Sequence, residues 1–322
     1  MRLIKPSFEI LEQGPGLRGI YKQIELAGRT CYKSLDKITD DSAEGFVNRM
    51  ITSKHYAMLE HGTVCLKVQD KVNEIGMTVP DLGLKGNYSN NPYSRVNYQT
   101  ENIKLYDRVL AEYAPVTTTY ITTNLRVLVE NGWFDDLKYL CEPTEFHKKR
   151  VTVRFTTSNS IMREFTRHRS HSFAVESTRY CNYSKDKFNN EITFIEPSWF
   201  NKEICDLDYI KYPTLPEGFF PEYDYSYWEE EKHKITKEAM FIWSLLTSEK
   251  AYLEAIRLGA KPQEAREVLP LATKCDMVMT GFVSDWEHFF DLRSRGTTGA
   301  PHPDAKALAD PLMHEFETRQ LI

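Results

Sequence analysis

Apolar positions along the chain follow two different periods, which predicts a fold that mixes strands with helices. Four stretches have the alternation or the β-branched composition of strands, namely residues 2–11, 62–68, 151–155 and 191–195. Three others have helical spacing, namely residues 20–26, 41–51 and 158–168. Ser158 or Asn159 can cap the last of these. We therefore expect an α+β fold, an antiparallel sheet with long helices.

The longest predicted helix runs from Tyr227 to Leu258. Its apolar residues form one stripe, and Gly259 supplies the stop. At 1.5 Å per residue this helix would be about 48 Å long, which suggests burial between subunits. Pro262 then suits the first turn of another helix, which ends near Pro270.

The stretch from about residue 70 to residue 147 differs from its surroundings. It includes an Asn-, Tyr- and Ser-rich loop at 86–99, after which the spacing predicts helices over Ile103–Tyr113 and Thr118–Glu130. We interpret the stretch as a helical elaboration inserted into a single domain of residues 1–322. The alternative interpretation is an ordinary stretch of the same domain, which would give the same sequence pattern.

The overall charge and composition exclude several classes of protein. The 322 residues carry 41 Lys+Arg against 46 Asp+Glu, and a net charge of −5 repels a polyanion, so any anion site must be local. We find no apolar run near the ~18 residues of a membrane-spanning helix, and Glu9 and Glu12 stand where a signal peptide needs apolar residues. The six cysteines lack C-x-x-C and zinc spacings, which favours reduced structural thiols. We expect a cytoplasmic protein that binds neither nucleic acid nor a membrane.

A glycine-rich pattern at residues 14–19 has the form G-x-G-x-x-G, but a turn accounts for it better. A dinucleotide-binding fold needs a second apolar strand directly after the following helix, with an acidic residue that binds the ribose. Residues 29–42 do not supply that strand. Phosphate-loop, zinc-protease and nucleophile-elbow signatures do not occur in the sequence either, so the chemistry must lie elsewhere.

The arginines between Val151 and Ser184 are the most informative chemical feature. This stretch contains no lysine before Ser184 but five arginines: Arg154, Arg163, Arg167, Arg169 and Arg179. A guanidinium binds phosphate through a planar fork whereas an ammonium is a point charge, so the bias favours an ordered phosphate site. Further along, Arg266 and Arg293 are candidates to contact a phosphate or a planar ring, although each alone would more often form a surface ion pair.

Three alternatives to a phosphate site exist for this segment, two for its arginines and one for its histidines. The arginines could form a solvated basic face paired with Glu164 and Glu176. With the aromatic residues among them they could bind single-stranded nucleic acid, which the net charge disfavours. His168 and His171 could ligate a metal, but no carboxylate cluster accompanies them, so we expect no metal.

Several segments match known motifs in order. Arg167-His168-Arg169 followed after seven residues by Ser177 has the form RHR-x7-S, and STRY at 177–180 continues it. Residues 27–32 resemble an AARxxY stretch and residues 55–61 an H-x-[ST]-x-x-E-H segment, while 265–270 and 289–293 resemble ARxxLP and FxxLR. On these motifs the chain resembles the flavin-dependent thymidylate synthases (the ThyX family). Residues 65–150 lie outside the resemblance.

The resemblance implies an FAD-dependent methyltransferase that converts dUMP to dTMP. Methylenetetrahydrofolate would give the carbon, FAD would carry the hydride and NADPH would reduce the flavin, in a homotetramer with active sites between subunits. The implied dUMP-binding residues are Glu164, Arg167, Glu176, Ser177, Thr178, Arg179, Arg266 and Arg293. Of these, Arg293 and Ser177 are the implied catalytic residues, Arg293 by stabilising charge on the uracil. The implied FAD-binding residues are His55, Arg167, His168, Arg169 and His288. The competing interpretation is a nucleotide- or RNA-binding module without catalysis.

Some positions depart from the family pattern. The family's N-E-x-S reads Ala174-Val175-Glu176-Ser177 here, so the glutamate is displaced by one position. Ala57 replaces a Ser or Thr, and Phe282 and Ser284 replace the Asn and Arg of the family's flavin segment. We expect these changes to alter FAD contacts rather than the reaction.

Overall fold

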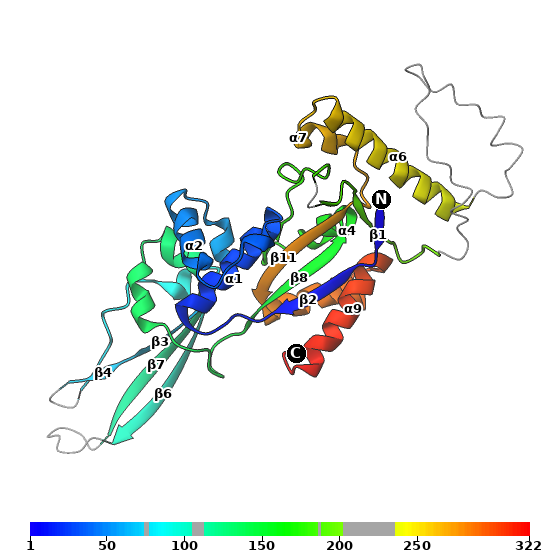
Figure 1. The fold of residues 1–322 in the computed structure, drawn as a ribbon. Helices are drawn as coiled ribbons and strands as arrows, with labels where there is room; N and C mark the ends of the chain where they lie inside the picture. The colour runs from blue at the N-terminus through cyan, green and yellow to red at the C-terminus, as the bar shows by residue number, and fades with distance from the viewer. Residues whose placement is uncertain (74–76, 105–112, 186–187, 202–235) are drawn as a thin grey trace, which may run out of the picture.

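The computed structural model describes residues 1–73, 77–104, 113–185, 188–201 and 236–322, with helices packed on a central antiparallel sheet (Figure 1). The sheet has the strand order β2-β8-β11-β9, formed by β2 (Ser7–Leu11), β8 (Arg150–Ser158), β11 (Lys274–Phe282) and β9 (Ser172–Val175). All three pairings are antiparallel. The α+β fold expected from the sequence is confirmed.

The other elements of the described residues surround this sheet. The α-helices are α1 (Gly16–Cys31), α2 (Ser42–Thr52), α3 (Leu125–Glu130), α4 (Asn159–Phe165), α6 (Lys237–Arg257), α7 (Pro262–Ala265), α8 (Val283–Phe290) and α9 (Pro303–Thr318). The remaining strands are β1 (Arg2–Ile4) with β10 (Thr193–Ile195), β4 (Lys71–Val72) with β5 (Thr78–Val79), and the three-stranded sheet of β3 (Thr63–Gln69), β7 (Tyr113–Asn124) and β6 (Arg95–Lys104). None of the helices in the described ranges is long and apolar enough to cross a membrane.

Both faces of the central sheet are buried under helices. Val278 of β11 packs in one apolar cluster with residues of α1 and α2, whereas Met277 and Met279 pack in a second cluster with residues of α8 and α9. Neighbouring residues of a strand point to opposite faces, so three consecutive residues of β11 supply both cores. In Figure 1 the β3-β7-β6 sheet extends from one side of the central sheet, and α6 and α7 lie at the opposite side.

The helices predicted for the stretch 70–147 are largely wrong. Strand β6 ends at Lys104 and strand β7 runs over Tyr113–Asn124, so only Leu125–Glu130 of the second predicted helix is helical. Residues 105–112, which fall in the first predicted helix, lie outside the described residues. From Val116 to Thr123 every residue except Tyr120 is β-branched, and this accounts for the difference, because such side chains lose rotamers in a helix and pack well on a pleated sheet. Whether the stretch is an insertion stays a prediction.

Two further elements differ from the prediction. The first predicted strand is split at Pro6 into β1 and β2, which belong to different sheets, and a proline has no N–H to donate to a ladder. The long helix is described as α6, whose 21 residues give a length of about 31 Å, while residues 227–235 lie outside the described residues. Gly259 has a φ of +101°, which fits its predicted role as a helix stop.

Candidate active site

The RHR motif lies in a turn between α4 and β9. The hydroxyl of Ser158 accepts a hydrogen bond from the backbone N–H of Ile161 at 3.3 Å, which confirms Ser158 as the cap of α4. The helix ends at Phe165, whose buried ring packs against Phe155 and Phe289 with centroids 5.1 and 4.9 Å away. The helix predicted to reach His168 is therefore shorter, and the motif follows its buried end. This packing anchors the turn to the core.

Arg293 is held against this turn by three hydrogen bonds. Its Nη1 donates to the carboxylate of Glu164 at 2.7 Å, its Nη2 to the backbone carbonyl of Glu164 at 2.9 Å, and its Nε to His168 Nε2 at 3.1 Å. Arg293 belongs to the π-helical turn Asp291–Arg295 that follows α8, 129 residues after Glu164. The fold thus brings together three residues that the sequence predicted for the site. A guanidinium has five N–H donors, so two remain for a ligand.

His168 is neutral in this arrangement. Burial, together with the positive charge of Arg293 and the nearby ring of His288, lowers the pKa of His168 to about 4. Because Arg293 Nε can only donate, His168 Nε2 must accept, which places the imidazole proton on Nδ1. The ring centroid of His288 lies 5.9 Å from that of His168.

Ser177 and Thr178 form a second group of predicted residues. Ser177 follows β9, where its backbone N–H donates to the carbonyl of Cys31 in α1 at 2.9 Å. The Thr178 hydroxyl accepts a hydrogen bond from Arg266 Nη1 at 3.4 Å, which links the predicted residues Thr178 and Arg266 across 88 positions of sequence. The exposed Arg179 lies beside Tyr180, with its Cζ 5.5 Å from the ring centroid. His55, by contrast, precedes the short 3-10 helix Tyr56–His61 and is exposed.

Four arginines of the segment have no acidic partner among the described residues. No carboxylate of the described ranges lies within 4.0 Å of Arg163, Arg167, Arg169 or Arg179. The fifth arginine of the stretch, Arg154, pairs with Glu9. The alternative of a basic face paired with Glu164 and Glu176 is not what the structure shows, because Glu164 binds Arg293 and Glu176 binds two lysines.

Glu176 lies in a buried ionic cluster that the sequence did not predict. Its carboxylate is 3.2 Å from Lys33 Nζ and 2.9 Å from Lys274 Nζ, and it accepts a hydrogen bond from the Asp276 backbone N–H at 3.0 Å. Asp276 in turn binds both lysines and accepts a hydrogen bond from the Thr156 hydroxyl at 2.7 Å. The Glu176 side chain is only 2% exposed. We interpret Glu176 as a residue that fixes the strand before Ser177; direct contact of its carboxylate with dUMP stays a prediction.

Two local features belong to this cluster, one of the backbone and one of the sequence. Lys33 follows the AARxxY-like stretch and adopts a φ of +48°, a left-handed conformation that is uncommon for a residue with a side chain. Lys274 and Asp276 alternate on β11 and so point to the same face of the sheet. Neither signal identifies the other partner, because Lys33 and Asp276 are 243 residues apart.

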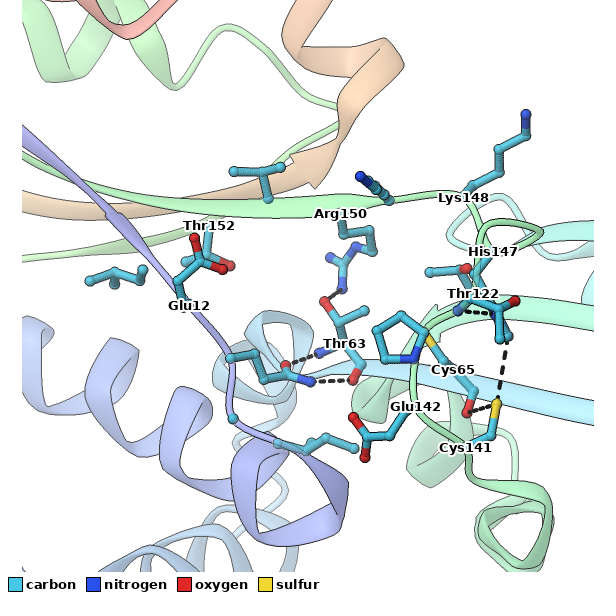
Figure 2. Close-up of a pocket in the computed structure, with 18 of the residues that line it drawn as sticks. Glu12, Thr63, Cys65, Thr122, Cys141, Glu142, His147, Lys148, Arg150 and Thr152 are labelled. Atoms are coloured by element: carbon cyan, nitrogen blue, oxygen red, sulfur yellow. Dashed lines mark hydrogen bonds between the residues drawn. The ribbon is translucent and has the colours of Figure 1, made fainter. Parts of the chain in front are cut away.

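A large cavity of about 710 Å³ lies elsewhere, and Figure 2 shows it beside Thr63, Cys65 and Arg150. It contains none of the residues that the sequence predicted for the site. Its polar groups largely bind one another. Gln13 exchanges two hydrogen bonds with the backbone of Thr63 at 2.9 and 2.8 Å, and Cys141 Sγ lies 3.8 Å from His147 Nε2. We interpret this cavity as a structural junction between the N-terminal segment and residues 140–152.

Together these contacts define an α+β protein in which one fixed arginine lies beside a turn whose arginines have no acidic partner among the described residues, an arrangement suited to an anionic ligand. The chain belongs to the Thy1 family, described as thymidylate synthase complementing protein, whose sequence profile matches residues 142–319. This confirms the family predicted from the sequence. The match includes the RHR segment, Arg266 and Arg293, whereas His55 and residues 27–32 precede it.

Individual relatives agree with this family. The chain is 28% identical over 172 residues to a probable flavin-dependent thymidylate synthase of Paramecium bursaria Chlorella virus 1, covering 53% of this chain and 69% of that protein. It is 28% identical over 141 residues to a flavin-dependent thymidylate synthase of Haloarcula marismortui, covering 42% and 51%. These relatives give no support to the alternative of a binding module without catalysis.

Two solved structures also resemble the chain. A UMP/dUMP methylase PolB from Streptomyces cacaoi, bound with 5-Br dUMP, aligns with a TM-score of 0.40 and 13% identity over 99% of this chain and 93% of that one. Thymidylate Synthase X from Helicobacter pylori, with FAD and dUMP, aligns with a TM-score of 0.34 and 11% identity over 95% and 91%.

Proposed function

We propose that this chain is a flavin-dependent thymidylate synthase, which methylates dUMP to dTMP with methylenetetrahydrofolate as carbon donor and NADPH as reductant of FAD. The observation that carries the proposal is the set of four arginines between residues 163 and 179 without an acidic partner in the described ranges. The two neighbouring acids bind other cations instead. A nucleotide phosphate and the pyrophosphate of FAD are the anions that the proposed reaction brings to such guanidinium groups.

The proposed dUMP site is built around the loop after β9. Arg179 and Arg266 would bind the phosphate, with the hydroxyls of Ser177 and Thr178 as further donors. Arg167, Glu164 and Glu176 complete the proposed set. The hydrogen bond from Arg266 to Thr178 supports this grouping because it already brings one phosphate-binding residue to the loop.

The residues proposed for FAD fit an anionic, planar cofactor. Arg167 and Arg169 are exposed, and no carboxylate of the described residues neutralises them, so they are available to a pyrophosphate. His168 is held neutral and oriented by Arg293, and His288 lies close to it, while His55 is the fifth proposed residue. Bound FAD would supply the hydride that completes the methyl group.

Arg293 is the proposed catalytic arginine. Methylation at C5 of uracil pushes electron density onto that carbon, and negative charge develops around the N3 and O2 side of the ring. A guanidinium fixed by Glu164 and His168, with two free N–H donors, would stabilise this charge without having to reorient. This is differential stabilisation of the transition state, so it acts on kcat.

We further propose a homotetramer with active sites between subunits. Arg167, Arg169, Arg179, His288 and His55 are all exposed in the single chain, although the reaction needs a site that excludes water. A second subunit would cover them. Light scattering tests the assembly, and a monomer with full activity would contradict it. The cytoplasmic location stays a prediction.

The function is tested by NADPH oxidation that depends on dUMP. The purified protein, loaded with FAD, should oxidise NADPH in the presence of methylenetetrahydrofolate and dUMP and should release dTMP. Omission of dUMP or of methylenetetrahydrofolate should abolish dTMP formation. A protein that stays colourless after incubation with FAD and forms no dTMP would contradict the proposal.

A further inference from the structure

A second cavity, of about 240 Å³, lies where the stretch 70–147 meets the part of the chain matched by the family profile. The first part contributes Arg95, and the second contributes Arg150, Ser170, Ser172, Phe282 and Asp285. Ser170 directly follows the RHR motif. The cavity therefore joins a segment that lies mostly outside the family match to the proposed cofactor-binding turn.

Two arginines approach the same aromatic ring at this cavity. The Cζ of Arg95 lies 4.5 Å from the ring centroid of Phe282, and the Cζ of Arg150 lies 5.6 Å from it. Two guanidinium groups near one ring repel each other, and partial burial strengthens that repulsion. Cation–π attraction to a single phenylalanine offsets only part of this cost. An anion between the two groups would remove it.

Neither arginine has an acidic partner among the described residues. Arg150 donates to the Thr63 hydroxyl at 3.2 Å and to the Glu60 carbonyl at 3.1 Å, and its Nε is buried without a hydrogen-bond partner. Within the described ranges, Arg95 donates only to the carbonyls of Pro92 and Ser94, at 3.0 and 2.9 Å. All of these acceptors are uncharged oxygens, so neither arginine forms an ion pair within the described part of the chain.

The pKa of Arg150 also reflects burial and a second nearby positive charge. Burial is the main cause that lowers the pKa of Arg150 to about 10, and the charge of Arg95 acts in the same direction, while Glu60 and Asp285 oppose the shift from beyond ion-pair distance. Arg150 is therefore still charged at neutral pH. The Asp285 carboxylate is itself engaged at the start of α8, where it accepts a hydrogen bond from the Phe282 N–H at 3.1 Å.

We propose that Arg95 and Arg150 form an anion site for a phosphate group of a nucleotide cofactor, to which the stretch 70–147 contributes Arg95. Ser170 and Ser172 line the same cavity, and their hydroxyls would add neutral donors. The cavity is smaller than the ~300 Å³ lower bound of typical pockets for whole small molecules, so it suits one phosphate or a pyrophosphate rather than a complete nucleotide. The site rests on the proposed function only for the origin of the phosphate, which is FAD or NADPH.

Arg95→Gln tests this site with inorganic pyrophosphate as the probe. Arg95 is partly exposed, so its replacement should leave the fold intact, whereas Arg150 lies in the core of the junction. Calorimetric titration of the full chain should show pyrophosphate binding at least about tenfold weaker in Arg95→Gln, the loss expected for one charge-assisted hydrogen bond. Arg95→Lys should recover part of the affinity. The matched control is Arg257→Gln, which removes an exposed arginine paired with Glu254 and should leave binding unchanged.

Titrations with FAD and with NADPH then identify the source of the phosphate. The cofactor that places its phosphate at this site should lose affinity in Arg95→Gln by the same factor as pyrophosphate, while the other cofactor keeps its affinity. Wild-type protein that does not bind pyrophosphate, equal affinities in wild type and Arg95→Gln, or an equal loss in Arg257→Gln would overturn the proposal. Loss of pyrophosphate binding in Arg95→Gln, together with a wild-type protein that forms no dTMP, would leave the anion site standing and contradict the proposed function instead.

Discussion

The chain contains two very different groups of charges, which meet in the sequence only at Glu176. Lys33, Glu176, Lys274 and Asp276 form a buried cluster in which two cations meet two anions. The arginines at 163, 167, 169 and 179 flank Glu176 in sequence, yet no carboxylate of the described residues lies within 4.0 Å of them. Glu176, which the sequence suggested as their partner, is turned into the core.

The buried charges stabilise the fold, whereas the exposed arginines remain available to bind a ligand. A buried ion is costly unless it is paired and hydrogen-bonded, so the cluster must be balanced internally. An exposed guanidinium is hydrated and needs no protein partner, so it can stay free for an anionic ligand. The two groups should therefore respond to mutation in different measurements, stability for the cluster and ligand binding or turnover for the arginines.

The largest effect should come from breaking the buried cluster. Glu176→Gln removes one of the two carboxylates of the described residues that bind Lys33 and Lys274, and removal of one partner of a buried ion pair typically costs about 3–5 kcal/mol of unfolding free energy. Chemical denaturation measures this loss. Glu254→Gln, which breaks an exposed pair with Arg257, is the control and should barely move the midpoint. Equal stability of wild type and Glu176→Gln would show that the cluster does not hold this part of the fold.

Arg293→Ala should give the next largest effect, and it should appear in turnover. Loss of one preorganised donor lowers kcat by roughly 10²- to 10³-fold in other enzymes, and we expect this range here while FAD stays bound. Steady-state kinetics with flavin content measured in parallel tests the prediction. An ordinary surface ion pair would contribute only ~1 kcal/mol to stability and little to rate. An unchanged kcat would remove Arg293 from the mechanism.

The buried cluster should also make stability depend on acidic pH. Burial raises the pKa of Asp276, but Lys274 and Lys33 outweigh this and lower it to about 2, below the ordinary value of 3.8. A lowered carboxyl pKa contributes stability that is present above the unfolded pKa and is lost as the pH falls through the folded pKa. The contribution of about 2 kcal/mol should therefore disappear between about pH 4 and pH 2. Denaturation curves of wild type and Asp276→Asn that keep the same separation at pH 5 and pH 2 would contradict this.

A moderate effect is expected for the unpaired arginines. Arg179→Lys keeps the positive charge but loses the planar fork, and we expect dUMP binding to weaken by about 1.5–3 kcal/mol. Calorimetric titration of dUMP into both proteins measures the change, and unfolding should stay the same because Arg179 is exposed. Equal affinities of the two proteins for dUMP would favour the alternative interpretation, in which this segment is a solvated basic surface.

The features of the fold and of the site that the sequence predicts are those that depend on residues close together in the chain. The cap at Ser158, the RHR motif and the antiparallel α+β class follow from residues close together in the chain. The resemblance placed Arg293, Glu164 and His168 at the site, but it did not predict that Arg293 contacts the other two residues.

The misses arise from tertiary contacts. Spacing alone predicts a helix over Thr118–Glu130, although residues 118–124 belong to strand β7, which pairs with both β3 and β6 in the three-stranded sheet. The cluster of Lys33 with Asp276, and the approach of Arg95 to Phe282, join positions that carry no shared local pattern. These residues come together only in the folded chain.

The smallest effect is expected for Ser177→Ala. The backbone of Ser177 is fixed without its hydroxyl, since its N–H donates to the Cys31 carbonyl and its own carbonyl accepts from the N–H groups of Tyr180 and Cys181. A nucleophilic serine needs a base within hydrogen-bond reach, and in the described part of the chain no His, Asp or Glu side chain hydrogen-bonds the Ser177 hydroxyl. We therefore expect the variant to keep its fold and to lose no more than about tenfold in kcat/KM, the range of one neutral hydrogen bond to substrate. Steady-state kinetics, with mass spectrometry of the protein quenched during turnover, tests this: complete loss of activity, or a nucleotide adduct on Ser177 in the wild type, would make the serine a nucleophile rather than a hydrogen-bond donor.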